Sequence, residues 1–190
     1  MKNNLLNSTS QYGWISIVLH WSMALVLIGM FFLGDYMVEL NYYDTWYHKA
    51  PAIHKATGII LGMFLMFRIG WNYAQSRPVS LEKSVTLTVL AKLGHLSIYL
   101  IIIVLCISGY FISTAKGQGI DVFYLFELPA LLADSADRGE AAGKVHDIAG
   151  SLFILIIVLH AIAGLVHHFA FKDRTLKRIL WVKKPPESIL

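Results

Sequence analysis

Three long stretches of the chain contain no Asp, Glu, Lys or Arg, and this feature limits most strongly what the chain can fold into. They cover residues 14–34, 93–115 and 148–171. Each reaches or exceeds the roughly 20 apolar residues that a helix needs to cross a bilayer. Hydrophobic residues make up 56% of the 190-residue chain, more than the roughly 45 to 50% of a soluble domain. These stretches therefore predict transmembrane helices.

A fourth stretch, between Pro51 and Tyr73, is interrupted near its ends by Lys55 and Arg68. Its uncharged part, residues 56–67, gives only roughly 18 Å of helix. Both basic side chains can snorkel toward opposite interfaces, so we expect a fourth span; a re-entrant segment is the alternative. The sequence thus predicts an all-α integral membrane four-helix bundle that forms a single domain, residues 1–190. The expected spans are residues 14–37, 50–73, 89–113 and 146–170.

Charges flanking the spans predict their orientation. The C-terminal tail, residues 172–190, is basic, and basic residues also flank the connection between spans two and three: Arg68, Arg77, Lys83 and Lys92. The other two connections are acidic on balance. The positive-inside rule therefore places both termini in the cytoplasm, and it accounts for the formal charge of +4 without a nucleic-acid partner. Within the long third connection, residues 121–133 could lie on the outer surface as a short amphipathic segment.

Four histidines inside the predicted spans lie at two depths: His20, His54, His146 and His160. An ionisable side chain in a bilayer costs several kcal/mol without a partner, so each marks a functional site. His160 follows His146 by fourteen residues, which is roughly 21 Å of helix on nearly the same face. The orientation pairs His20 with His160 on the inner side and His54 with His146 on the outer side. Two imidazoles from two helices at each level predict the ligation of two haems in one bundle.

The rest of the sequence limits how such haems are held. Cys106 is the only cysteine and no C-x-x-C-H motif is present, so both haems are expected to be non-covalent. Glycines follow three of the four histidines at i+4, on the same helix face, and would leave room for a macrocycle: Gly58, Gly150 and Gly164. Close helix packing is the alternative explanation for them. Arg68 is expected at the inner level, where it would bind a haem propionate or serve only topology.

Other histidines are expected outside the ligand set. His95 enters span three on the inner side and could contact the inner haem, contact a quinone or hydrogen-bond within the bundle. His167 follows His160 by seven residues and could serve quinone protonation. His48 is expected at the surface and His168 at the headgroup level. Cys106 is expected to be an apolar filler.

These residues resemble the bacterial cytochrome b561 family of small di-haem membrane proteins. The resemblance is carried by Ile17-Val-Leu-His20-Trp21, by His54 with Arg68, by Leu93-Gly-His95-Leu with Tyr99, and by Leu159-His160-Ala followed by His167-His168-Phe-Ala-Phe-Lys172-Asp173. It covers most of the chain from Trp14 to about Leu180.

The resemblance implies two b haems, on His20/His160 and His54/His146, in a multi-pass protein of the bacterial inner membrane. It implies electron transfer between an outer-face donor and the ubiquinone pool, as in a superoxide:ubiquinone oxidoreductase. The inner side, with His95, His167 and Lys172, is where quinone chemistry is expected. Superoxide would be served by a positive outer funnel, for which the outer basic residues are candidates: Lys49, Lys55, Arg138 and Lys144.

Two other functions remain open from the sequence. One is a haem-binding electron-transfer subunit of a larger dehydrogenase or reductase, docking a redox donor protein on its acidic outer loops. The other is a metal or proton transporter that uses the same histidines. No Asp or Glu accompanies them in the middle of the spans, which argues against transport. Membrane lipid and quinone are the remaining expected partners.

Overall fold

The computed structural model describes residues 4–82 and 84–182. Within these residues, four helices are long and apolar enough to cross a membrane: α1 (Trp14–Val38), α2 (Lys49–Ala74), α3 (Val85–Ser113) and α4 (Ala136–Phe169). The predicted class, an all-α membrane four-helix bundle, is confirmed. The weaker second stretch forms a continuous helix of 26 residues rather than a re-entrant segment. The charge argument also used residues that lie outside the described part of the chain: Lys83, and Lys183, Lys184 and Glu187 of the C-terminal tail.

The fourth helix starts much earlier than its predicted span. Ser135 caps it, because the Ser135 side-chain oxygen accepts from the backbone N–H of Arg138 at 3.2 Å. The helix has 34 residues, roughly 51 Å, whereas the hydrocarbon core is about 30 Å thick. The prediction followed hydropathy, so it missed the polar turns that carry α4 beyond the apolar span.

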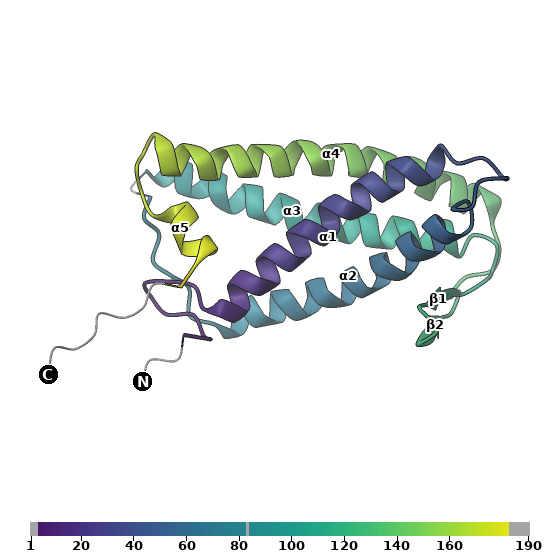
Figure 1. The fold of residues 1–190 in the computed structure, drawn as a ribbon, viewed down its shortest axis with the longest axis horizontal. Coiled ribbons are helices and arrows are strands. Elements are labelled where there is room, and N and C mark those ends of the chain that lie inside the picture. The colour runs from purple at the N-terminus through teal and green to yellow at the C-terminus, as the bar shows by residue number, and fades with distance from the viewer. Residues whose placement is uncertain (1–3, 83, 183–190) are drawn as a thin grey trace, which may run out of the picture.

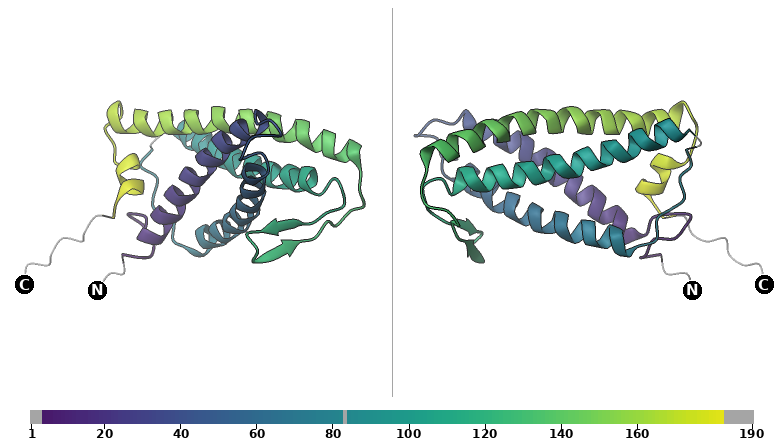
Figure 2. Two further views of the ribbon diagram at one scale, coloured as in Figure 1. Left: turned by 45° about the vertical axis from the view of Figure 1, so that its right-hand side comes forward. Right: turned by 180° about the vertical axis from the view of Figure 1, so that it is seen from behind.

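The long helices form one bundle in which α3 and α4 run side by side and α1 crosses obliquely (Figures 1 and 2). Helix α2 packs on both α1 and α3. Among the described residues, α4 packs along α3 and α1 packs on α2, with no comparable contact between α4 and either α1 or α2. A short helix, α5 (Thr175–Leu180), lies where α1 begins; Trp21 Nε1 donates to the Ile179 carbonyl at 2.8 Å. We call this the α5 end of the bundle and the opposite one the hairpin end.

The hairpin end takes its name from a two-stranded antiparallel sheet in the connection between α3 and α4. Strand β1 (Ile120–Val122) pairs with β2 (Phe126–Leu128). Ile120 and Val122 are buried and pack against Ala56 of α2. The segment expected to be amphipathic at the surface is therefore a β-hairpin attached to the side of a helix.

The bundle core is a layer of four buried side chains, one from each long helix: Met23, Leu65, Ile102 and Phe153. Phe153 lies seven residues from both His146 and His160, so this layer separates the two histidine levels. Only 22% of the most apolar window of α1 or α2, and 11% of that of α3 or α4, is buried inside the protein. Many of the other apolar side chains are exposed on the outside of the bundle, where lipid would cover them.

Candidate haem sites

The structure brings the four intramembrane histidines together as two pairs. His54 of α2 and His146 of α4 have ring centroids 6.2 Å apart near the hairpin end. His20 of α1 and His160 of α4 have ring centroids 6.3 Å apart near the α5 end. All four rings are partly buried. Each histidine pair joins α4 to α1 or α2, two helices with which α4 itself is not in close contact.

The ring separations can be compared with those of two imidazoles on one metal ion. A metal–nitrogen bond of about 2.0 Å, plus roughly 1.1 Å from nitrogen to ring centroid, puts two opposite ligands about 6.2 Å apart. Both pairs match this separation. Side-chain size and helix spacing therefore fit bis-imidazole ligation at both levels.

The hairpin-end pair is positioned by α3 and α1 as well as by its own helices. Ser108 of α3 is buried, donates to the Val104 carbonyl at 2.7 Å and stands 3.0 Å from His146 Nδ1. Because its hydroxyl hydrogen points at the carbonyl, Ser108 Oγ accepts from the Nδ1–H of His146. This tautomer leaves the lone pair of His146 Nε2 free for a metal.

Two glycines that sequence reasoning did not single out also contact this pair. A Cβ at Gly34 would lie 3.3 Å from His54 Cε1, and a Cβ at Gly109 would lie 3.2 Å from His146 Cε1. Both glycines are on the helices that pack beside the histidine, α1 and α3. The His54 Nδ1 atom is buried and has no hydrogen-bond partner among the residues that the structure describes. No sequence signal could have identified these glycines, because they lie far along the chain from the rings they touch.

At the α5 end, Arg68 reaches the level that its spacing predicts. Its Nη2 lies 3.0 Å from His20 Nδ1, and its Nη1 donates to the Leu19 carbonyl at 3.0 Å. A guanidinium can only donate, so His20 Nδ1 accepts in this contact. A neutral imidazole that ligates through Nε2 carries its proton on Nδ1. Ligation would therefore release Arg68 to another acceptor.

His95 contacts the same pair from α3. Its ring centroid is 5.1 Å from that of His160 in an edge-to-face arrangement, and its Nδ1 donates to the Ala91 carbonyl at 2.6 Å. This separation is shorter than the ~6.2 Å worked out for two opposite ligands. The geometry thus favours His20 over His95 as the partner of His160, and it places His95 at the edge of that pair.

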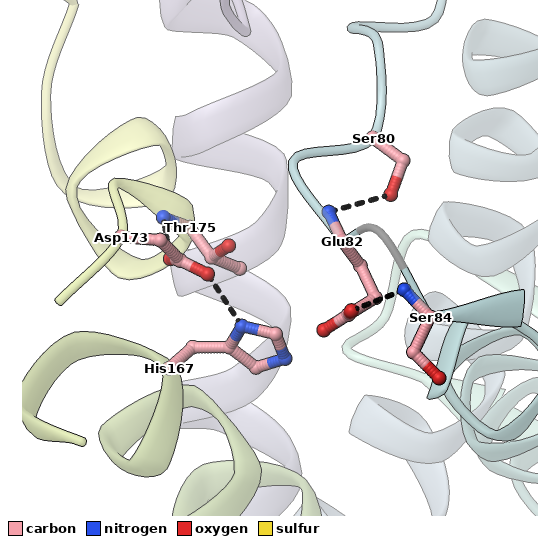
Figure 3. A network of polar contacts seen from close by, with 6 residues as sticks. All are labelled: Ser80, Glu82, Ser84, His167, Asp173 and Thr175. Carbon is pink, nitrogen blue, oxygen red and sulfur yellow. Dashed lines mark hydrogen bonds and ion pairs between the residues drawn. The ribbon is translucent and has the colours of Figure 1, made fainter. Parts of the chain in front are cut away.

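His167 forms a hydrogen bond to a carboxylate that the sequence analysis did not anticipate. Its Nδ1 donates to Asp173 Oδ2 at 2.6 Å, just beyond the end of α4, and Thr175 N donates to Asp173 Oδ1 at 2.7 Å (Figure 3). Burial raises the pKa of the Asp173 carboxyl, but the hydrogen bonds from His167 and Thr175 outweigh it and hold that pKa below its ordinary value. The neighbouring Lys172 is exposed, with a left-handed φ of 54°.

The other predicted features have mixed placements. A Cβ at Gly150 would meet nothing within 4 Å, whereas one at Gly58 would meet Met30 and one at Gly164 would meet Leu176. Gly62, one turn after Gly58 on α2, lies against Cys106, so this glycine serves packing between α2 and α3. The role of these glycines in making room for a macrocycle stays a prediction. His48 is exposed beside Tyr42 and Tyr47, as expected.

The charges at the hairpin end are mixed. Lys144 forms an ion pair with Glu140 at 2.7 Å, and Arg138 donates to the Thr114 carbonyl at 3.4 Å. Lys49 and Lys55 are exposed on α2, on either side of His54. Of the four basic residues that could attract an anion, Lys144 is thus already paired with a carboxylate.

The fold and the site together define a multi-pass membrane protein with two pairs of histidines between its helices. The comparison with known proteins then identifies the group. The chain belongs to the prokaryotic cytochrome b561 family, whose model matches residues 11–181. These are haem-binding electron-transfer proteins of bacterial membranes, and membership implies b-type haem.

Individual relatives agree with this assignment. The chain is 45% identical to cytochrome b561 homolog 2 of Escherichia coli (strain K12) over 175 residues, which cover 92% of this chain and 93% of that protein. It is 29% identical to the probable superoxide oxidase CybB of Yersinia pestis over 180 residues, covering 92% and 98%. It is 27% identical to cytochrome b562 of Cereibacter sphaeroides over 175 residues, covering 89% and 94%.

Proposed function

We propose that the chain holds two non-covalent b haems and carries electrons through the membrane from a donor at the hairpin end to ubiquinone at the α5 end. The observation that carries this proposal is the pair of ring separations, 6.2 and 6.3 Å, on the two sides of one buried apolar layer. Along α4 the two levels are fourteen residues apart, roughly 21 Å.

In this proposal His54 and His146 ligate one haem, and His20 and His160 ligate the other. A bound haem supplies a reversible one-electron couple. Ser108 orients His146 by accepting its Nδ1 proton in a hydrogen bond, while Arg68, released from His20, binds a propionate. The apolar layer around Phe153 keeps water out of the space between the two levels.

The α5 end supplies the groups that quinone reduction needs. Quinone reduced to quinol takes up two electrons and two protons, so protonatable side chains must lie within reach. His95 lies at the edge of the His20/His160 pair, and His167 donates a hydrogen bond to Asp173 where α4 ends. Lys172 is exposed beside them. We assign His95, His167 and Lys172 to the quinone side. In a bacterial inner membrane, the positive-inside rule places this side of the protein at the cytoplasmic face.

Superoxide is the proposed donor. One electron leaves each superoxide as it becomes dioxygen, so two superoxides are oxidised for each quinone that is reduced. The proposal is supported by the similarity to a probable superoxide oxidase, and by Lys49 and Lys55, which are exposed near His54. These ammonium groups would attract the anion to the hairpin end.

An electron-transfer subunit of a larger complex is the second candidate. It is favoured by Asp121 and Glu127, which are exposed on the hairpin and would suit a basic donor protein. The purified protein alone separates the two: superoxide-driven reduction of a ubiquinone analogue supports the enzyme. Absence of this reaction in protein that contains both haems supports the subunit.

The haem assignment is tested by haem content per chain, measured as the pyridine haemochrome. We expect two b haems in the wild type and one each in His54→Ala and His160→Ala. His48→Ala is the matched control, since this histidine is exposed at the surface and should leave both haems bound. Two haems in either of the first two variants would contradict the pairing.

A further inference from the structure

The β-hairpin lies beside α2 rather than beyond its end. Val122 is fully buried and Ile120 is 3% exposed, and both pack against Ala56. Ala56 is seven residues into α2, roughly 10 Å below its first residue. Figures 1 and 2 show the hairpin on the side of α2 that faces away from α4. The hairpin therefore lies about two turns inside the first residue of α2, beside this helix.

The hairpin connection also contacts a second helix, α3. Tyr110 of α3 packs near the hairpin, and its hydroxyl donates to the Pro129 carbonyl at 2.9 Å and accepts from Leu131 N at 2.9 Å. The segment that follows β2 is thus hydrogen-bonded to α3, while β1 packs against α2. These contacts fix the direction in which the turn of the hairpin projects.

The hairpin has one charged face. Asp121 of β1 is paired in register with Glu127 of β2, and side chains alternate along a strand. Both carboxylates therefore lie on the face opposite Ile120 and Val122, and both residues are exposed. Two like charges opposite each other repel unless water solvates them, so this face belongs in water.

The turn itself is apolar and exposed. Residues 123–126 read Phe-Tyr-Leu-Phe, and their exposed fractions are 43%, 97%, 77% and 42%. Phe123 and Tyr124 both have left-handed φ values, 52° and 59°. Hairpin turns of this shape favour Asn and Gly, because larger side chains strain the backbone there. Here the chain keeps large aromatic side chains at both strained positions, which points to a use for the side chains themselves.

We propose that residues 123–126 insert into the membrane interface at the hairpin end and anchor the bundle in lipid. Tyr124, near the end of a spanning helix, matches the tyrosines of the aromatic belts of membrane proteins, and the Phe and Leu side chains of the turn add exposed apolar surface. The helix against which the hairpin packs, α2, also exposes Ile53 and Ile60. The charged face with Asp121 and Glu127 then lies in the aqueous layer. The anchor holds α2, and with it His54, at a fixed depth.

The test is a fluorescent label on the turn in lipid vesicles. Tyr124→Cys is made in a Cys106→Ala background and labelled with an NBD maleimide, in vesicles of phosphatidylethanolamine and phosphatidylglycerol. Gln118→Cys, exposed in the same connection before β1, is the matched control. Unchanged haem absorbance shows that each labelled protein is folded.

At position 124 we expect blue-shifted emission that is quenched by doxyl-labelled lipid and little quenched by iodide. At position 118 we expect the reverse. Quenching of the 124 label by iodide alone would place the turn in water and overturn the proposal. Protection from both quenchers would mean that protein covers the turn, and this too would overturn it.

Discussion

Replacement of Ser108 by alanine tests the positioning of the hairpin-end pair most directly. The side chain is 4% exposed, and its oxygen accepts from His146 Nδ1 at 3.0 Å. Water cannot easily replace it, so Ser108→Ala removes the hydroxyl that accepts from the buried Nδ1–H, and the Leu105 carbonyl remains as a neighbour of the ring. Such a loss costs about 1 to 3 kcal/mol. At 1.4 kcal/mol per factor of ten, haem affinity at this level should fall roughly 5- to 150-fold.

The same change should raise the midpoint potential of one haem. A hydrogen bond from Nδ1–H increases the electron donation of the imidazole and so stabilises ferric iron, and its removal favours the ferrous form. Haem affinity can be followed by transfer to apomyoglobin, and the potential by a redox titration monitored by absorbance. The haem between His20 and His160 should keep its potential, because the substitution lies at the other level.

Ser113→Ala provides a matched control. Ser113 lies on the same helix and its hydroxyl donates to the Gly109 carbonyl at 2.8 Å, the same type of bond that Ser108 makes to Val104. If the two variants lost haem at the same rate with unchanged potentials, the hydrogen bond to His146 would have no role in ligation. The proposed tautomer would then be wrong.

Three further changes give separate expectations. Gly109→Val should displace the His146 ring, because even a Cβ at this position stands 3.2 Å from it. The haemochrome assay should then show the loss of one haem. Gly29→Val is the control: this glycine has open space around it, so the variant should keep both haems. Phe153→Ala should lower the free energy of unfolding by about 3 kcal/mol, since it opens a cavity in the buried layer. If this variant kept the wild-type unfolding temperature in detergent, the layer would not contribute to stability. Asp173→Asn should lower the unfolding temperature near neutral pH. The hydrogen bonds hold the pKa of Asp173 below its ordinary 3.8, so its carboxylate stabilises the folded chain above that value and loses this contribution as the pH falls through the lowered pKa. The difference between Asp173→Asn and wild type should therefore narrow in acid, and a difference that is constant with pH would contradict the assignment.

Much of the architecture could be predicted because a bilayer allows few solutions. Long uncharged runs must form spans, and a spacing of fourteen residues must put His146 and His160 on one face at two depths. The same reasoning placed Arg68 at the level of His20, where the structure has it. These conclusions need only the geometry of a single helix.

The contacts between helices could not be predicted in this way. Hydropathy does not fix how each helix is rotated against its neighbours when lipid surrounds them all. The glycines expected to matter were those on the same helix as each histidine, whereas Gly34 and Gly109 touch the rings from adjacent helices. The role of Ser108 could not be predicted for the same reason: it contacts His146 from another helix, and the whole hairpin connection separates the two residues along the chain.

The sequence by itself determined the spans, the two depths and the choice of histidines, because these follow from chain periodicity and from the cost of polar groups in lipid. The tertiary structure decided which atoms hold each ring and how the connection between α3 and α4 folds. It also turned α5 back so that Trp21 reaches Ile179 and placed Asp173 against His167. Such placements depend on how packed helices and loops meet in space, and that information is distributed over residues far apart in the chain.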